Sequence, residues 1–263
     1  MIVREEPDGS LILIAQPDHA TVSGVFAARW GNARFDRPRR YESTVRAATF
    51  HDSGWYRYQT APRLMGDSGK AANFMQVPLD PEQLEAFQWV IDWLTNIDPY
   101  AGLLISKHRT GLWRDRYNTV RHPAGFTARN PDPAVEHFTL RNEARQAQEI
   151  KAFDEAEFRV NFHWLQVWDL LSLYFCMRPP GEDYIDPVPA RYSDGAGVGA
   201  PMTLRPLGGP RVAIDPYPFD TPTLPFSVVC RRLPVSTFPD VATFREAYFK
   251  AAPELLTFEL VPA

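Results

Sequence analysis

Cysteine is scarce in this 263-residue chain, and long apolar runs are missing from it. The two cysteines, Cys176 and Cys230, are too few for a disulfide framework and are not spaced for a zinc site. No stretch reaches the roughly 18 uninterrupted apolar residues of a membrane-spanning helix. The N-terminus lacks the basic and then apolar regions of a signal peptide. We therefore expect a cytoplasmic protein in a reducing compartment, with no membrane partner.

A surplus of positive charge is also absent. The chain has 28 Lys and Arg against 32 Asp and Glu, a formal net charge of −4 and a pI near 5.9. Nucleic acids are bound mainly through clustered cations, so this balance argues against a nucleic-acid partner. The apolar content of 44% and the charged content of 23% are typical of a globular protein. The length allows one large domain or one domain with an appended subdomain.

Helical patterns dominate residues 18–177. Asp18 is expected to cap a helix that ends at Gly31. The segment Asp80-Pro81-Glu82-Gln83 combines a capping residue, a first-turn proline and a glutamine three residues after the cap, and so predicts another helix start. Further helices are expected over residues 42–52, 99–113 and 133–177.

Proline-rich sequence follows this helical part. Thirteen of the 25 prolines fall between residues 179 and 239, which argues against long helices there. One helix is expected at about 240–251. Short apolar runs predict strands at 211–214, 226–231 and 255–261.

The expected fold is mostly α, with a helical bundle over residues 18–177, an N-terminal β-hairpin in residues 1–17 and a β-rich subdomain in residues 178–263. The segment Pro7-Asp8-Gly9-Ser10 provides the hairpin turn. Because a two-stranded hairpin is marginally stable alone, we expect it to join the C-terminal sheet. The glycine-rich stretch 195–199 follows no predicted strand and opens no predicted helix, so we interpret it as a loop.

The doublet His51-Asp52 is the first motif with a chemical interpretation, because it stands where an apolar helical pattern is about to stop. The two residues can simply end a helix, with Gly54 as a left-handed C-terminal cap. Metal ligation is the alternative, since at a helix terminus both side chains can turn toward an ion beyond the end.

Asp169 favours metal ligation. It lies within residues 164–176, which are apolar nearly all round and are therefore expected to form a central buried helix. A buried carboxylate is normally paired or bound to a metal ion. The alternative partner is an arginine such as Arg46 or Arg145.

His19 and His108 are the remaining candidate ligands, although a single buried histidine is more often structural than ligating. Imidazoles and carboxylates suit a divalent Mn, Fe, Ni, Co or Zn ion, and oxygen-rich sites shift the preference toward Mg or Mn. The predicted ligand set is His19, His51, Asp52, His108 and Asp169.

The order of these residues resembles the HD-domain metal-dependent phosphohydrolase superfamily, in which an isolated His precedes a His-Asp doublet and a late Asp in a buried helix. The segments Gln16-Pro17-Asp18-His19-Ala20, His51-Asp52-Ser53-Gly54-Trp55 and Ser106-Lys107-His108 are similar to an uncharacterised bacterial branch of that superfamily, a family of unknown function. The resemblance implies an HD-like helical bundle and a divalent ion that activates water for attack on a small phosphate ester or nucleotide.

Dinuclear members of that superfamily carry two more histidines between the doublet and the last Asp. His108 fits one of these positions, but neither His122 nor His137 fits the other, so we expect a single ion. The alternatives to a phosphohydrolase are a non-catalytic, metal-containing binding or regulatory module and an HD-type iron oxygenase, which usually needs the dinuclear centre.

The resemblance also suggests roles for individual side chains. Asp52 and His108 are the predicted catalytic residues, with His108 either a fifth ligand or an acid that protonates the leaving oxygen. Trp55 is expected to line the pocket. The phosphate of the substrate is expected to meet cations of the locally basic segment after residue 106, although each of these can instead belong to a solvated surface. These cations are Lys107, Arg109 and Arg114.

Overall fold

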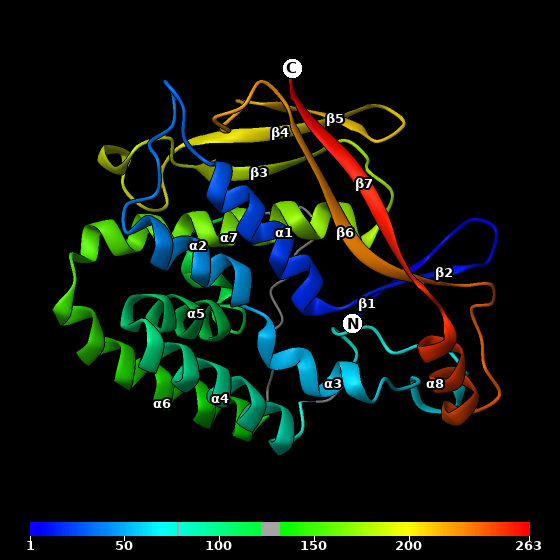
Figure 1. The fold of residues 1–263 in the computed structure, drawn as a ribbon. Helices are drawn as coiled ribbons and strands as arrows, with labels where there is room; N and C mark the ends of the chain where they lie inside the picture. Colours follow the sequence, from blue (N-terminus) through cyan, green and yellow to red (C-terminus); the bar gives the residue numbers. More distant parts are fainter. Residues whose placement is uncertain (78, 122–131) are drawn as a thin grey trace.

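The structure, a computed structural model, describes residues 1–77, 79–121 and 132–263. About half of the residues are helical, and a curled sheet of seven strands lies against the helices (Figure 1). Helices α1 (Gln16–Arg29) and α7 (Glu155–Met177) contact the sheet on one side and the other helices on the other. The expected helical region, N-terminal hairpin and β-rich C-terminal part are present, but helices make up only about half of the residues, and the hairpin and the C-terminal strands form one sheet. No helix of the described ranges is long and apolar enough to cross a membrane.

The longer helices form where the sequence predicts them, but the start of α1 differs and the short helix α3 was not predicted. Helix α1 begins at Gln16, two residues before the expected cap Asp18, because Pro17 is tolerated in a first turn that needs no N–H donor. Asp80 does cap α4, since its carboxylate accepts from the Gln83 amide at 2.8 Å. The helices are α1 Gln16–Arg29, α2 Tyr41–Phe50, α3 Tyr56–Thr60, α4 Pro81–Ile97, α5 Pro99–Gly111, α6 Pro133–Glu149, α7 Glu155–Met177 and α8 Val241–Lys250.

The sheet has the order β1-β2-β6-β7-β5-β4-β3, in which only the β5–β7 pair is parallel. The prediction that the N-terminal hairpin joins the C-terminal strands is confirmed, because β2 pairs with β6 and places Leu13 opposite Arg231. The strands are β1 Ile2–Glu5, β2 Leu11–Ile14, β3 Asp183–Val188, β4 Ala200–Gly208, β5 Arg211–Asp215, β6 Leu224–Leu233 and β7 Pro253–Pro262.

Strands β3 and β4 were not predicted, because both contain prolines that weaken a strand pattern. Proline is accepted in β3 because this strand lies at the edge of the sheet, where a missing N–H leaves no partner unpaired. In β4 the register shifts between Pro206 and Gly208. The strand is held by the alternation of buried Met202 and Leu204 with exposed neighbours.

Helix α7 is the centre of the core, and nearly all of its residues from 158 to 176 are buried. Trp168 packs against Trp30 of the α1 end, and Phe175 packs against Phe226 and Phe258 of the sheet, with ring centroids 4.9 Å apart in both pairs. One hydrophobic cluster therefore continues from the helices into the sheet. This packing fixes the polar residues of α7 in a dry environment.

Candidate metal centre

The five predicted ligands converge at the meeting point of α1, α5, α7 and the end of α2. Every one of them is at most 4% exposed. An imidazole nitrogen or carboxylate oxygen of each lies within 4.8 Å of such atoms of two others. The predicted residues are His19, His51, Asp52, His108 and Asp169.

The doublet reaches the site because the chain turns sharply after α2. His51 is the C-terminal capping residue of α2, and Asp52 precedes the short 3-10 helix η1, Ser53–Trp55. Gly54 does not act as a left-handed cap. It lies against α4, where a Cβ atom would stand 2.5 Å from Phe87 Cδ1. The glycine therefore allows close packing of η1 on α4, and this packing aims the doublet inward.

The hydrogen bonds of His51 determine which of its nitrogens is free. Its Nδ1 lies 2.8 Å from the carbonyl oxygen of Ala48, which can only accept, so Nδ1 carries a proton. In the neutral ring, the Nε2 atom is then unprotonated and carries a lone pair. This atom lies 3.3 Å from Asp169 Oδ1 and 3.9 Å from Asp52 Oδ2, and it has no hydrogen-bond partner of normal geometry in the described chain.

His19 is oriented in the same way by Ser172. The Ser172 hydroxyl donates to the carbonyl oxygen of Asp169 at 2.9 Å, so its oxygen accepts from His19 Nδ1 at 2.7 Å. The Nε2 atom of His19 then faces Asp52 Oδ2 at 3.0 Å and Asp169 Oδ1 at 3.9 Å. In the neutral rings, two imidazole lone pairs meet two carboxylate oxygens, and such a group of acceptors is satisfied by a cation between them or by protons on the rings.

Each carboxylate uses its other oxygen to bind an arginine. Asp52 Oδ1 pairs with Arg109 Nη2, and Asp169 Oδ2 lies 2.8 Å from Arg116 Nη2. Burial by itself would raise the pKa of Asp52, but Arg109 and His19 outweigh it and hold this pKa well below its usual range. Burial opposes ionisation of Asp169 too, and Arg116 and His51 lower its pKa in the same way. Both groups are therefore ionised at neutral pH.

The arginine beside Asp169 was not predicted. Arg46 binds Asp98 and Arg145 binds Asp92, so the two arginines proposed from the sequence lie elsewhere. Arg116 reaches the site from the 3-10 helix η3, Asp115–Asn118, in which four consecutive non-glycine residues have φ between 50° and 56°. L-residues seldom adopt this left-handed conformation, so sequence patterns gave no sign of it.

The candidate ligand atoms form two overlapping groups of three, one of His19, His51 and Asp169 and one of His51, Asp52 and His108, and within each group the atoms lie within 4.8 Å of one another. Atoms bound to a common ion at about 2.0–2.2 Å lie about 3.0–3.6 Å from one another. The separations of 3.0 and 3.3 Å lie in this interval, and the two of 3.9 Å lie just outside it. A proton competes for the same place: burial lowers the pKa of His51, but Asp169 and Asp52 outweigh burial and raise it. The buried cluster can hold a metal ion.

His108 differs from the other two histidines. Arg116 donates to Gln166 Oε1 at 2.5 Å, and an arginine has no acceptor, so the amide nitrogen of Gln166 must face His108. This amide donates to His108 Nδ1 at 3.0 Å. The neutral ring therefore carries its proton on Nε2 and presents an N–H group to the site. Burial and the nearby His51 lower the pKa of His108 well below 6.5, which keeps the ring neutral at pH 7.

The predicted substrate-binding residues lie in different environments in the structure. Arg109 holds Asp52 and lies over the Phe87 ring, with its guanidinium carbon 6.0 Å from the centre of the buried Trp55 ring. Arg114 points to Glu136 and Glu143. Lys107 points into a separate pocket. Of the histidines considered for a second ion, His137 is exposed on α6, and residue 122 lies outside the described residues.

Fold and site define a helical protein with a curled mixed sheet and a buried His/Asp cluster that can hold a metal ion. Residues 1–235 match DUF3891, described as a protein family of unknown function, and the chain belongs to this family. The expectation of a family of unknown function is thereby confirmed, and membership of the HD-domain superfamily stays a prediction. Comparison with curated proteins and with solved structures gives no match.

Proposed function

We propose that this protein is a metal-dependent phosphohydrolase that acts on a small phosphate ester or nucleotide. His19, His51, Asp52 and Asp169 would hold a single divalent ion of the Mn, Fe, Co, Ni or Zn class. The observation that carries the proposal is the buried Nε2 lone pair of His51, which faces two carboxylate oxygens and has no normal hydrogen-bond partner among the described residues. A buried acceptor left in this state is unfavourable unless a cation satisfies it.

The charges around the cluster support an anionic substrate. Arg109 and Arg116 already balance the charges of Asp52 and Asp169. A divalent ion would therefore leave a surplus of two positive charges in a dry site. Hydroxide and a phosphate ester are the ligands that restore the balance, whereas a neutral substrate would leave the surplus uncompensated.

When bound, a divalent ion at this place supplies an activated water and polarises a phosphoryl oxygen. The side chains around it have separate tasks. Arg109 and Arg116 fix the two carboxylates and keep them ionised. The Nε2–H group of the neutral His108 is suited to donate a hydrogen bond to a phosphoryl or leaving oxygen as negative charge develops. Of the two roles considered for His108, this tautomer favours the donor over the fifth ligand.

One observation favours the alternative of a non-catalytic, metal-containing module. The five predicted ligands are at most 4% exposed, so a substrate reaches the cluster only after surrounding elements move apart. A closed site is also what a purely structural ion needs. The same burial limits any substrate to a small molecule. The second alternative, an HD-type iron oxygenase, would be indicated by oxygen consumption in the presence of Fe(II).

The decisive experiment measures metal content and hydrolysis in the same samples. Protein purified without chelators should contain about one equivalent of a divalent ion by elemental analysis and should hydrolyse a member of a panel of phosphorylated metabolites. Asp169→Asn should lose the ion. Asp98→Asn is the matched control, because Asp98 is also buried and arginine-paired but lies outside the cluster, and asparagine keeps its capping role. A fully metallated protein without hydrolysis would indicate the module; protein that binds no ion would overturn both.

A further inference from the structure

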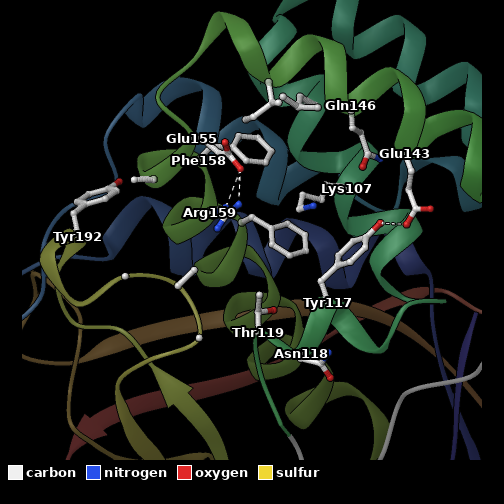
Figure 2. A pocket seen from close by; sticks show the side chains of 18 residues that line it. Lys107, Tyr117, Asn118, Thr119, Glu143, Gln146, Glu155, Phe158, Arg159 and Tyr192 are labelled. Atoms are coloured by element: carbon white, nitrogen blue, oxygen red, sulfur yellow. Dashed lines mark hydrogen bonds and ion pairs between the residues drawn. The ribbon is translucent and has the colours of Figure 1, made fainter.

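A pocket of about 1120 Å³ is lined by residues outside the candidate metal centre (Figure 2). Its walls come from α5, α6, α7 and η3, together with the loop of residues 195–197. None of the five cluster residues lines it. The pocket is therefore a separate candidate binding site, and its chemistry can be judged independently of any ion.

Lys107 is the distinctive side chain of this pocket. Its Nζ atom lies 4.1 Å from the centre of the Tyr117 ring and 5.4 Å from the centre of the Phe162 ring. The side chain is half-buried, and within the described chain no carboxylate lies within ion-pair distance of the ammonium group. Burial lowers the pKa of Lys107 from its ordinary value, which shows that the ammonium group lacks full solvation.

The other charges at the pocket are already paired. Glu143 accepts from Arg114 at 3.2 Å and from the Tyr117 hydroxyl at 2.8 Å. Glu155 binds Arg159 on the next turn of α7. These carboxylates already have direct donors, so among the described residues at the pocket the ammonium of Lys107 is the charged group without a direct ion-pair partner. An anion from solution is what would complete it.

The walls of the pocket are mostly apolar, so a ligand that fits it should also have an apolar part. The rings of Phe158 and Phe162 and the side chain of Leu103 line the pocket on the α5 and α7 side, whereas Asn118 offers a polar group from η3. A site of mostly apolar walls with a few directed polar groups is typical of small-molecule binding. We propose that this pocket binds a small organic anion with a flat apolar body, whose acidic group contacts Lys107 and whose body packs on the half-buried side chains of Tyr117 and Ile150.

The fluorescent dye anilinonaphthalene sulfonate has the required chemistry and can be titrated into the full-length protein as purified. A sulfonate is a poor metal ligand, so the outcome does not depend on the metal centre. Lys107→Met should weaken binding about tenfold, the effect of losing one charge-assisted contact, while Lys107→Arg should retain it. Lys151→Met removes an exposed cation from the neighbouring η4 helix, Ile150–Ala152, and should change nothing.

A second variant tests the pocket without touching its charge. Ala156 is exposed on α7 and lines the pocket, so Ala156→Trp should fill the space and abolish dye binding while the near-ultraviolet circular dichroism shows an intact fold. The exposed groove around Trp89 and Trp93 is the competing apolar surface. Unchanged affinity in Lys107→Met, or loss of binding in Trp89→Ala alone, would overturn the proposal.

Discussion

Gln166 donates a hydrogen bond to His108 Nδ1 at 3.0 Å, and this bond places the His108 proton on the nitrogen that faces the cluster. The direction of the bond is not free, because Arg116 occupies the amide oxygen of Gln166. His108 thus becomes a hydrogen-bond donor toward the cluster, whereas the Nε2 atoms of His19 and His51 are unprotonated and carry lone pairs. The orientation of the buried Gln166 amide therefore makes His108 a hydrogen-bond donor, while the other two histidines remain candidate metal ligands.

Gln166→Glu should reverse the role of His108. A carboxylate at this position accepts from Arg116 and also from Nδ1 of His108, so the proton moves to Nδ1 and Nε2 becomes a fifth lone pair. We expect the histidine nitrogen NMR spectrum of the metal-free variant to show this change of tautomer, and its affinity for a divalent ion to rise. Gln166→Met, which removes both polar groups, is the control. A His108 proton that remains on Nε2 in Gln166→Glu would refute the assignment.

Arg116→Met should destabilise the fold strongly. The substitution leaves the Asp169 carboxylate buried without its cation, and breaking a buried pair in this way typically costs about 3–5 kcal/mol. Urea denaturation measures the change in the free energy of unfolding. Addition of a divalent ion should restore part of the loss, because the ion replaces the missing charge.

The matched control for this change is Arg145→Met. Arg145 binds two carboxylates, Asp92 and Glu149, near the surface, where such pairs contribute about 0–1 kcal/mol. Equal losses in the two variants would mean that the Asp169–Arg116 pair has no special role in holding the cluster.

The members of the buried His/Asp cluster could be picked out from the sequence where they leave a local sign. Asp169 interrupts an apolar helix, and His51-Asp52 interrupts a helix end. Their convergence follows from helix packing, which sequence periodicity expresses well. The helix start at Asp80 is also a local event, since its carboxylate caps α4.

The partners of these ligands could not be predicted, because they depend on contacts between distant segments. Arg116 comes from a left-handed turn that no residue preference announces. Gln166 is polar in an apolar helix, as Asp169 is, yet its role depends on Arg116 and appears only when the two are placed together. Strand β3 was missed for a related reason, because its proline is acceptable only at a sheet edge.

His163 should make the fold sensitive to acid. Its Nε2–H donates to the carbonyl oxygen of Pro187 at 2.8 Å, and its Nδ1 accepts from the Gly197 amide at 2.9 Å, so the buried ring is held neutral. Burial lowers its pKa from 6.5 to about 4. Between these values the unfolded chain binds more protons, so the contribution of this group is complete above pH 6.5 and is lost as the pH falls toward 4.

The expected loss from this one histidine is about 3 kcal/mol, since each pKa unit corresponds to about 1.4 kcal/mol. His163→Gln keeps a donor and an acceptor without a titrating group, so its free energy of unfolding should fall less steeply between pH 6.5 and 4. His137→Gln, at an exposed position of α6, should follow the wild-type curve. Parallel curves for the wild type and His163→Gln would contradict the assignment.

Gly54→Ala should disturb the metal centre from outside it. The added methyl group would stand 2.5 Å from Phe87 Cδ1 and 3.0 Å from the Phe87 Cα atom, so relief requires movement of η1 away from the α4 backbone. Overpacking of this kind typically costs about 1–3 kcal/mol. Because Asp52 directly precedes η1, the same movement should misplace its carboxylate and weaken metal binding. Calorimetric titration of the metal-free protein measures that affinity, and thermal unfolding measures the stability. Gly181→Ala is the control, since a Cβ atom there meets nothing within 4 Å. A variant that loses stability but keeps its full affinity for the ion would show that the packing of η1 on α4 does not position the doublet.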